Sequence, residues 1–166
     1  IVVPLVQRLT ELVAFKDQAA SDWVHHGATS QDVIDTAMII QIKKGLTIIE
    51  GDIGRLTSGL ESLISKYSNQ IMIGRTLLQP SVPITFSEKV RGWQLALRRN
   101  WKRVEMNAAE ALLLQFGGAA GNLSSLGRDG IEVRKKLSEI LELGLSDDVW
   151  HTHRDRIVAL CSAVSI

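Results

Sequence analysis

The sequence has little of what several classes of protein require. Its 166 residues include a single cysteine, Cys161, so no disulfide can form within the chain, which fits a reducing compartment. No apolar run approaches the roughly 18 to 20 residues that span a bilayer, and no signal-peptide pattern opens the chain. The formal net charge of +1 gives no reason to expect nucleic acid. We therefore expect a cytoplasmic protein with a small-molecule partner, and neither nucleic acid nor membrane as a partner.

The two ends of the chain lie inside apolar helical patterns. Residue 1 is isoleucine rather than methionine, and residues 157–164 form a second apolar run. Hydrophobic residues make up 45% of the chain, enough for one buried core. We expect residues 1–166 to be a single fragment of a longer protein.

A long helix is predicted over residues 30–67. Its apolar positions follow steps of three and four, which is the mark of one helix face. They are Ile34, Met38, Ile42, Leu46, Ile49, Ile53, Leu56, Leu60, Leu63 and Tyr67. Four glycines inside it each cost about 1 kcal/mol relative to alanine. Either the helix breaks near Gly51 or close packing in a larger assembly offsets the cost; a continuous or gently bent helix is our expectation.

The rest of the chain predicts further helices and no strand. Apolar spacing favours helices over residues 87–114 and 129–143, the second ending at Gly144 as a C-cap, and a last helix after residue 156. Gly74, Pro80 and Pro83 interrupt residues 68–86, which we predict to be a polar connecting loop. The predicted fold class is therefore all-α, a bundle of long helices.

Polar side chains are concentrated at the start of the long helix. Thr29 or Ser30 can act as N-cap, and Asp32 lies in the first turn, where free N–H groups favour oxygen ligands and can bind an anion. An ordinary capped helix would explain Ser30, Gln31 and Asp32 alone. It would not require the preceding pair of histidines.

Other kinds of site have weak support. The glycine-rich residues 116–127 follow a helix rather than a strand, unlike a dinucleotide-binding loop. The four histidines lack the i, i+4 spacing of a zinc helix, so we expect no metal. What remains is a set of polar clusters with few carboxylates, at residues 25–31, 75–85, 117–125 and 151–156. Such clusters suit a substrate with several carboxylates, with proton transfer by histidine or by a residue outside the chain.

Four motifs carry a resemblance to a known superfamily. His25-x-Gly-Ala-Thr-Ser-Gln-Asp-x-x-Asp-Thr and Gly74-Arg75-Thr76-Leu77-Leu78-Gln79-Pro80-x-x-Pro83-Ile84-Thr85-Phe86 resemble two signature regions of the fumarase, aspartase, argininosuccinate lyase and adenylosuccinate lyase superfamily. Within it, Leu114-Gln115-Phe116-Gly117-Gly118-Ala119-Ala120-Gly121 and Trp150-His151-Thr152-His153-Arg154-Asp155-Arg156 resemble the 3-carboxy-cis,cis-muconate cycloisomerase branch.

The resemblance implies a fold, an assembly and a reaction. It implies the central helical domain of a homotetramer, without the N- and C-terminal domains of the parent protein, and active sites that are each built from three subunits. The implied reaction interconverts 3-carboxy-cis,cis-muconate and a carboxymuconolactone in protocatechuate breakdown, the β-ketoadipate pathway, with no metal or organic cofactor and a small tricarboxylate substrate.

The resemblance also implies roles for individual residues. His25 is the candidate catalytic residue, whereas His26 has no match and is interpreted as structural. Thr29 and Ser30 match contacts to a substrate carboxylate, and Arg154 resembles a substrate cation. The full implied substrate-binding set is Thr29, Ser30, Gln31, Arg75, Thr76, Gln79, Thr85, His151 and Arg154.

Two departures from the superfamily pattern leave alternatives open. Lyases of the superfamily carry histidine where this chain has Leu77, which cannot transfer a proton; this favours the cycloisomerase branch. The third signature, a Gly-Ser-Ser-x-Met-Pro-x-Lys-x-Asn loop that supplies the catalytic serine, is absent, so we expect the fragment alone to be inactive. The alternatives are an adenylosuccinate-lyase-like enzyme that releases fumarate and a non-catalytic helical assembly fragment.

Overall fold

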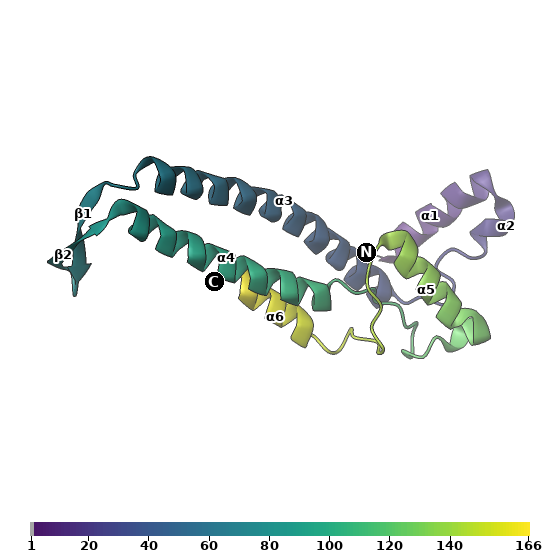
Figure 1. Ribbon diagram of the computed structural model, residues 1–166. Coiled ribbons are helices and arrows are strands. Elements are labelled where there is room, and N and C mark those ends of the chain that lie inside the picture. The colour runs from purple at the N-terminus through teal and green to yellow at the C-terminus, as the bar shows by residue number, and fades with distance from the viewer. Residues whose placement is uncertain (1) are drawn as a thin grey trace. The chain divides into compact units, whose positions relative to one another are not determined.

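The computed structural model describes residues 2–166 as helices joined by loops and one β-hairpin (Figure 1). Its elements are α1 (Val2–Lys16), α2 (Gln18–Ser21), α3 (Ser30–Lys66), β1 (Ile71–Thr76), β2 (Gln79–Thr85), α4 (Phe86–Ala111), the 3₁₀ helix η1 (Ser124–Asp129), α5 (Gly130–Leu141) and α6 (Asp155–Val164). The largely helical fold class predicted from the sequence is confirmed. No helix among residues 2–166 combines the length and the apolar character needed to cross a membrane.

The chain divides into two compact units. The first contains Ile1–Lys44 and Ala109–Ala159, and the second contains Gly45–Ala108 and Leu160–Ile166. The hydrophobic core of the first unit is formed by Ile39, Leu114, Phe116, Leu143 and Trp150, with partly buried side chains of α3 and α5 packed around it. This core joins the start of α3, the segment after α4 and the segment before α6. The first and the last of these carry the predicted site residues of the unit.

Helix α3 is unbroken over its 37 residues, as the apolar period predicts. Its interior glycines do not interrupt it. A Cβ built on Gly45, Gly54 or Gly59 would meet no atom within 4 Å. Packing against other residues of the described chain therefore does not account for these glycines.

The prediction of a strandless loop over residues 68–86 is wrong, because β1 and β2 pair as an antiparallel hairpin. Its turn has Leu77 and Leu78 at φ 45° and 65°. Positive φ at both central positions is the mark of a type I′ turn, and the usual sequence signal for that turn is Asn-Gly. Two leucines give no such signal. Prolines are tolerated in this hairpin since a two-stranded sheet consists only of edge strands.

Two predicted helix ends are also wrong. Helix α4 ends at Ala111 rather than residue 114, because Leu114 N donates to Gly144 O at 2.8 Å and Gly144 N donates to Leu112 O at 2.9 Å. Gly144 is thus not the C-cap of α5. The left-handed cap is Glu142, with φ 52°, whose N–H donates to carbonyls of the last turn. A Cβ on Gly144 would lie 2.5 Å from Leu113 Cδ2, so a larger residue there would require the Leu113 side chain to move.

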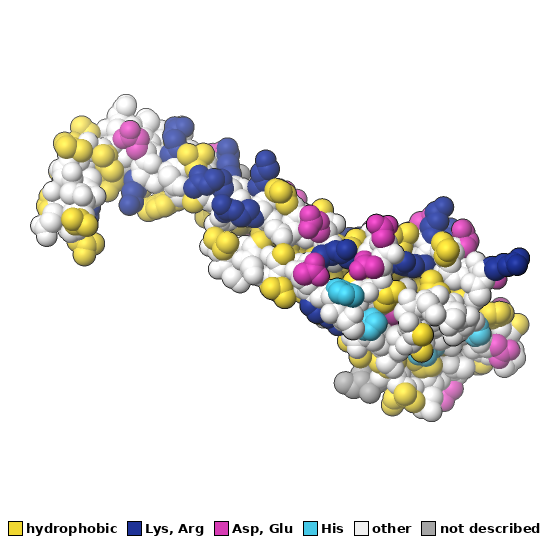
Figure 2. Space-filling view, turned by 90° about the horizontal axis from the view of Figure 1, so that it is seen from below, with side chains coloured by type: hydrophobic (Ala, Val, Ile, Leu, Met, Phe, Trp, Pro, Cys, Tyr) yellow, Lys and Arg dark blue, Asp and Glu magenta, His cyan; other side chains and the backbone are white. Residues whose placement is uncertain are grey.

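Charged and hydrophobic side chains are interspersed on the face that Figure 2 shows. Several large hydrophobic side chains of the second unit are exposed in this chain, among them Ile48 (69%), Leu56 (50%) and Trp93 (52%). Apolar exposure of this kind is typical of surfaces that another chain covers.

Candidate functional site

The start of α3 is fixed by a buried carboxylate. Thr29 occupies the position before the helix, and its backbone N–H donates to Asp32 Oδ2 at 3.0 Å. This is one half of a capping box, in which the third helical residue reaches back to the N-cap. The hydroxyls of Thr29 and Ser30 have no hydrogen-bond partner within residues 2–166, and Ser30 is exposed. Thr29 holds the N-cap position expected from the sequence, but the capping contact is made by the Asp32 carboxylate and not by the Thr29 or Ser30 hydroxyl.

Asp32 does more than cap the helix. It is 3% exposed, and its Oδ1 accepts hydrogen bonds from Gly117 N at 3.1 Å and Gln115 Nε2 at 3.0 Å. Its Oδ2 also accepts from Gly118 N at 2.9 Å. The glycine-rich segment is therefore held against the start of α3 by its own backbone donors. A Cβ on Gly118, at φ 72°, would lie 2.7 Å from Gly27 O, so glycine is needed there.

Both histidines of the first region line one cavity of about 460 Å³ in the first unit. His25 has a left-handed backbone, with φ 62°, and is half-buried. His26 packs edge-on against Trp23, with ring centroids 5.0 Å apart, which fits a structural role. Asp32, Thr36 and Gln115 also line this cavity. The geometry does not by itself separate the two imidazoles, so the assignment of His25 stays a prediction.

Arg154 is paired within the protein. Its Nη1 and Nη2 donate to Asp35 Oδ1 and Oδ2 at 2.9 and 3.0 Å, and the guanidinium lies 5.5 Å from the centre of the Trp150 ring. The Asp35 side chain is 3% exposed and that of Arg154 is 38% exposed. Arg154 therefore compensates a buried carboxylate, and any substrate carboxylate that bound it would share the guanidinium with Asp35.

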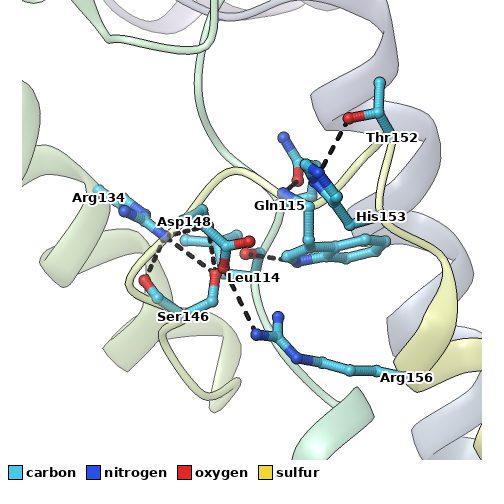
Figure 3. Close-up of polar contacts among 9 residues, drawn as sticks. Leu114, Gln115, Arg134, Ser146, Asp148, Thr152, His153 and Arg156 are labelled. Carbon is cyan, nitrogen blue, oxygen red and sulfur yellow. Dashed lines mark hydrogen bonds and ion pairs between the residues drawn. The ribbon is translucent and has the colours of Figure 1, made fainter.

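The segment before α6 is held in place by several polar contacts (Figure 3). Arg134 Nη2 donates to the carbonyls of Ser146 and Asp148 at 2.6 and 3.1 Å, and Arg156 Nη2 lies 3.5 Å from Asp148 Oδ1. Within this segment His151 is half-buried, and its Nδ1 is buried without a hydrogen-bond partner among the described residues. The substrate-binding role of His151 therefore stays a prediction.

The second unit carries the other predicted substrate-binding residues, on the hairpin. Arg75, Thr76 and Gln79 lie at the turn and are exposed. Arg75 Nη1 donates to Leu78 O at 3.4 Å. Arg75 also lines a cavity of about 390 Å³ together with Lys89. The structure thus collects two cationic side chains beside this cavity.

Thr85, at the end of the hairpin, is the N-cap of α4. Its N–H and hydroxyl both donate to Glu88 Oε2 at 3.0 Å, while Glu88 N donates to Thr85 Oγ1 at 3.2 Å. This is a complete capping box. The hydrogen bond from the Thr85 backbone, followed by that from its side chain, holds the pKa of Glu88 below its usual value of 4.5. The Thr-x-x-Glu spacing could have predicted it.

The predicted site residues therefore fall into two sets. His25, Thr29, Ser30, Gln31, His151 and Arg154 belong to the first unit, and Arg75, Thr76, Gln79 and Thr85 belong to the second. Sequence reasoning missed the buried partners Asp35 and Gln115, whose contacts join residues 119 and 35 positions apart in the chain, respectively. No local spacing signals such contacts.

Comparison with known proteins shows the family of this chain. A family model described as "Lyase" matches residues 2–166. The 3-carboxy-cis,cis-muconate cycloisomerase of Bradyrhizobium diazoefficiens is 41% identical over 164 residues, covering 99% of this chain and 36% of that protein. The Acinetobacter baylyi enzyme of the same name is 39% identical over 166 residues, covering 100% of this chain and 37% of that protein.

A solved structure of a similar enzyme also matches this chain. The crystal structure of 3-carboxy-cis,cis-muconate lactonizing enzyme from Pseudomonas putida matches with a TM-score of 0.90 and 39% identity. The match covers 98% of this chain and 37% of that chain. This chain thus spans somewhat more than a third of the length of the relatives that it matches.

Proposed function

This chain belongs to the lyase family, and we propose that the whole protein interconverts 3-carboxy-cis,cis-muconate and a carboxymuconolactone. The observation that carries the proposal is the 41% identity to a cycloisomerase over 99% of the chain. Both signature regions and both branch motifs of the sequence lie inside that match.

The chemistry of the reaction fits the donors at the start of α3. In lactonisation a carboxylate oxygen of the substrate forms a bond to one carbon of a double bond, and a proton is delivered to the neighbouring carbon. The substrate is isomerised without net oxidation or reduction, so the step needs no electron acceptor. What it needs is donors that hold three carboxylates and stabilise developing negative charge.

We assign one of those carboxylates to the start of α3. The hydroxyls of Thr29 and Ser30 are unengaged, and the first-turn N–H groups of a 37-residue helix favour an anion. Gln31 lies in the same turn. His151, whose Nδ1 has no hydrogen-bond partner among the described residues, lies in the segment before α6. The partly exposed guanidinium of Arg154 would bind a second carboxylate while it stays paired with Asp35. His25 is our candidate for proton transfer within this chain.

Leu77 separates this proposal from a lyase that releases fumarate. It stands at the position where lyases of the superfamily carry histidine. Its side chain is 93% exposed at the hairpin turn. An isobutyl side chain cannot accept or donate a proton, so an adenylosuccinate-lyase-like activity is disfavoured.

The proposal includes a homotetramer with active sites shared between subunits, in the cytoplasm. Exposed apolar side chains of α3 and α4 such as Ile48, Leu56 and Trp93 support an assembly surface. The open space beside Gly54 supports it too, because a neighbouring helix can approach closely there. A catalytic group that this chain lacks would come from the remainder of the whole protein. The unpaired thiol of Cys161 is compatible with a reducing compartment.

The test is the activity of the whole protein on 3-carboxy-cis,cis-muconate. Conversion removes a conjugated double bond, so the ultraviolet absorbance of the substrate should fall. The lactone, which has the same mass as the substrate, should co-elute with an authentic standard in chromatography. Unchanged absorbance would overturn the proposal. Adenylosuccinate serves as the competing substrate, and release of fumarate from it would favour the alternative.

A matched pair of variants tests the assignment of the α3 start. Thr29→Val removes the hydroxyl and keeps the backbone N–H that Asp32 accepts, so KM for the substrate should rise about tenfold, the worth of one hydrogen bond to a charged group. Thr10→Val makes the same change on α1, where the hydroxyl donates only to Val6 O. It should leave KM unchanged.

A further inference from the structure

Gln115 lies at the junction of three segments that the proposed function uses. It is 1% exposed. Its backbone is attached to α3 twice, since Gln115 N donates to Thr36 Oγ1 at 3.2 Å and Thr36 Oγ1 donates to Gln115 O at 2.8 Å. This attachment leaves the side chain of Gln115 between α3 and the segment that precedes α6.

The two ends of the Gln115 amide contact different segments. Nε2 donates to Asp32 Oδ1 at 3.0 Å, and Oε1 accepts from Trp150 N at 2.9 Å. The chemistry of the partners fixes this orientation, because a backbone N–H can only donate and a carboxylate at this contact accepts. Each end of the amide therefore has a hydrogen-bond partner.

Both contacts lead to predicted substrate-binding residues. Asp32 accepts the N–H of Thr29, which begins α3, so the amide of Gln115 restrains the carboxylate that fixes that helix start. Trp150 precedes His151 directly, and its ring lies against the guanidinium of Arg154. A single side chain thus connects the position of Thr29 with the position of the His151–Arg154 segment.

We propose that Gln115 is a positioning residue that sets the start of α3 and the Trp150–Arg154 segment relative to one another for substrate binding. This inference rests on the proposed function, since it supposes that Thr29 and His151 contact the same substrate. Gln115 itself is buried, and both ends of its amide are bound by other residues of the protein. It acts through Asp32 on one side and through Trp150 on the other.

Only an amide of this length satisfies both partners. Glutamate would still accept from Trp150 N, but it would place a second carboxylate oxygen against Asp32 and provide no donor. Methionine has the same length and offers neither donor nor acceptor of comparable strength, leaving Trp150 N without its partner. Gln115→Met and Gln115→Glu therefore remove different parts of the same connection, at little change in volume.

The experiment compares these two variants with Ser138→Ala in the whole protein, with 3-carboxy-cis,cis-muconate as substrate. Ser138 is a suitable control because it is 7% exposed and its hydroxyl donates at 2.6 Å to Leu143 O. That bond closes the end of α5 and leads to no predicted substrate contact. KM, kcat and the thermal unfolding midpoint are measured for each, well below that midpoint.

Positioning and stability alone give different results. We expect both Gln115 variants to raise KM about tenfold or more with kcat within about threefold, since a contact that holds substrate in ground and transition state alike changes KM. Ser138→Ala should lower the unfolding midpoint and leave KM unchanged. A wild-type KM for folded Gln115→Met, with only a lowered midpoint, would overturn the inference.

A second measurement keeps the inference separate from the proposed function. If the wild-type protein does not convert the substrate, the proposed function fails, and the connection made by Gln115 is then judged by amide hydrogen exchange. Gln115→Met should accelerate exchange at residues 29–32 and at Trp150 together, whereas Ser138→Ala should not. Unchanged exchange at residues 29–32 would overturn the inference independently of any activity.

Discussion

The ion pair between Asp35 and Arg154 should make an asymmetric contribution to stability. The Asp35 side chain is 3% exposed and that of Arg154 is 38% exposed. Removing Arg154 leaves a carboxylate that water cannot reach, whereas removing Asp35 leaves a guanidinium that water can hydrate. Breaking a buried pair from one side costs about 3 to 5 kcal/mol. Because Arg154 is partly hydrated, we take the lower end, about 3 kcal/mol, for Arg154→Met.

A loss of about 3 kcal/mol lowers the folding equilibrium constant by roughly a hundredfold, since about 1.4 kcal/mol corresponds to a factor of ten. Urea denaturation of the whole protein at fixed protein concentration, followed by far-ultraviolet circular dichroism, measures it. Asp35→Asn alone should cost less, and Asp35→Asn should recover part of the loss in the double variant, because a buried amide is cheaper than a buried charge. The control is Arg156→Met, whose partner Asp148 is 50% exposed and whose removal should cost under about 0.5 kcal/mol.

The reasoning would be refuted by the opposite asymmetry. If Asp35→Asn destabilised the protein more than Arg154→Met, burial of the carboxylate would not be the source of the cost. A loss below about 1 kcal/mol for Arg154→Met would place the pair among surface ion pairs instead.

Three further predictions concern the second unit. The pKa of Glu88 is lowered in the folded state. Its capping bond to Thr85 should therefore stabilise the start of α4 at pH values above the unfolded pKa, and this stabilisation should be lost as pH falls through the folded pKa. Glu88→Gln should abolish this pH dependence, measured as amide exchange at residue 85. Replacing Leu77 and Leu78 by Asn and Gly should stabilise the hairpin by about 1 kcal/mol in thermal unfolding, since both positions need positive φ. Gly54→Leu, where nothing lies within 4 Å in the described chain, should leave helicity unchanged and weaken the proposed tetramer of the whole protein in analytical ultracentrifugation. An unaltered oligomeric state would contradict the proposed assembly surface.

Much of the fold follows from local patterns, and the exceptions have physical causes. The spacing of apolar residues predicted α3 and α4, because an amphipathic helix repeats its apolar positions over many turns. The hairpin was not predicted because Leu77 and Leu78 occupy a turn that usually carries Asn-Gly. Its prolines also argued against strands, since proline interrupts the hydrogen bonding of larger sheets. The end of α4 at Ala111 was not predicted because it depends on the pairing of Leu114 with Gly144. No neighbouring residue in the sequence indicates that contact.

The candidate site shows the same division. The helix start at Thr29 and Ser30 is visible in sequence because caps have a local composition. Asp32 was placed in the first turn of α3 from the sequence, but its contacts with Gly117 and Gly118 were not predictable, since they join residues 85 and 86 positions apart. Gln115 is a buried polar residue inside a motif, and only its two partners reveal its use.

The central claim is that the start of α3 holds a substrate carboxylate, and a structure of the whole protein with its substrate bound tests it most directly. We expect one carboxylate within about 2.7 to 3.2 Å of the Thr29 and Ser30 hydroxyls, the range of an ordinary hydrogen bond. All three substrate carboxylates bound elsewhere, with both hydroxyls facing solvent, would contradict it.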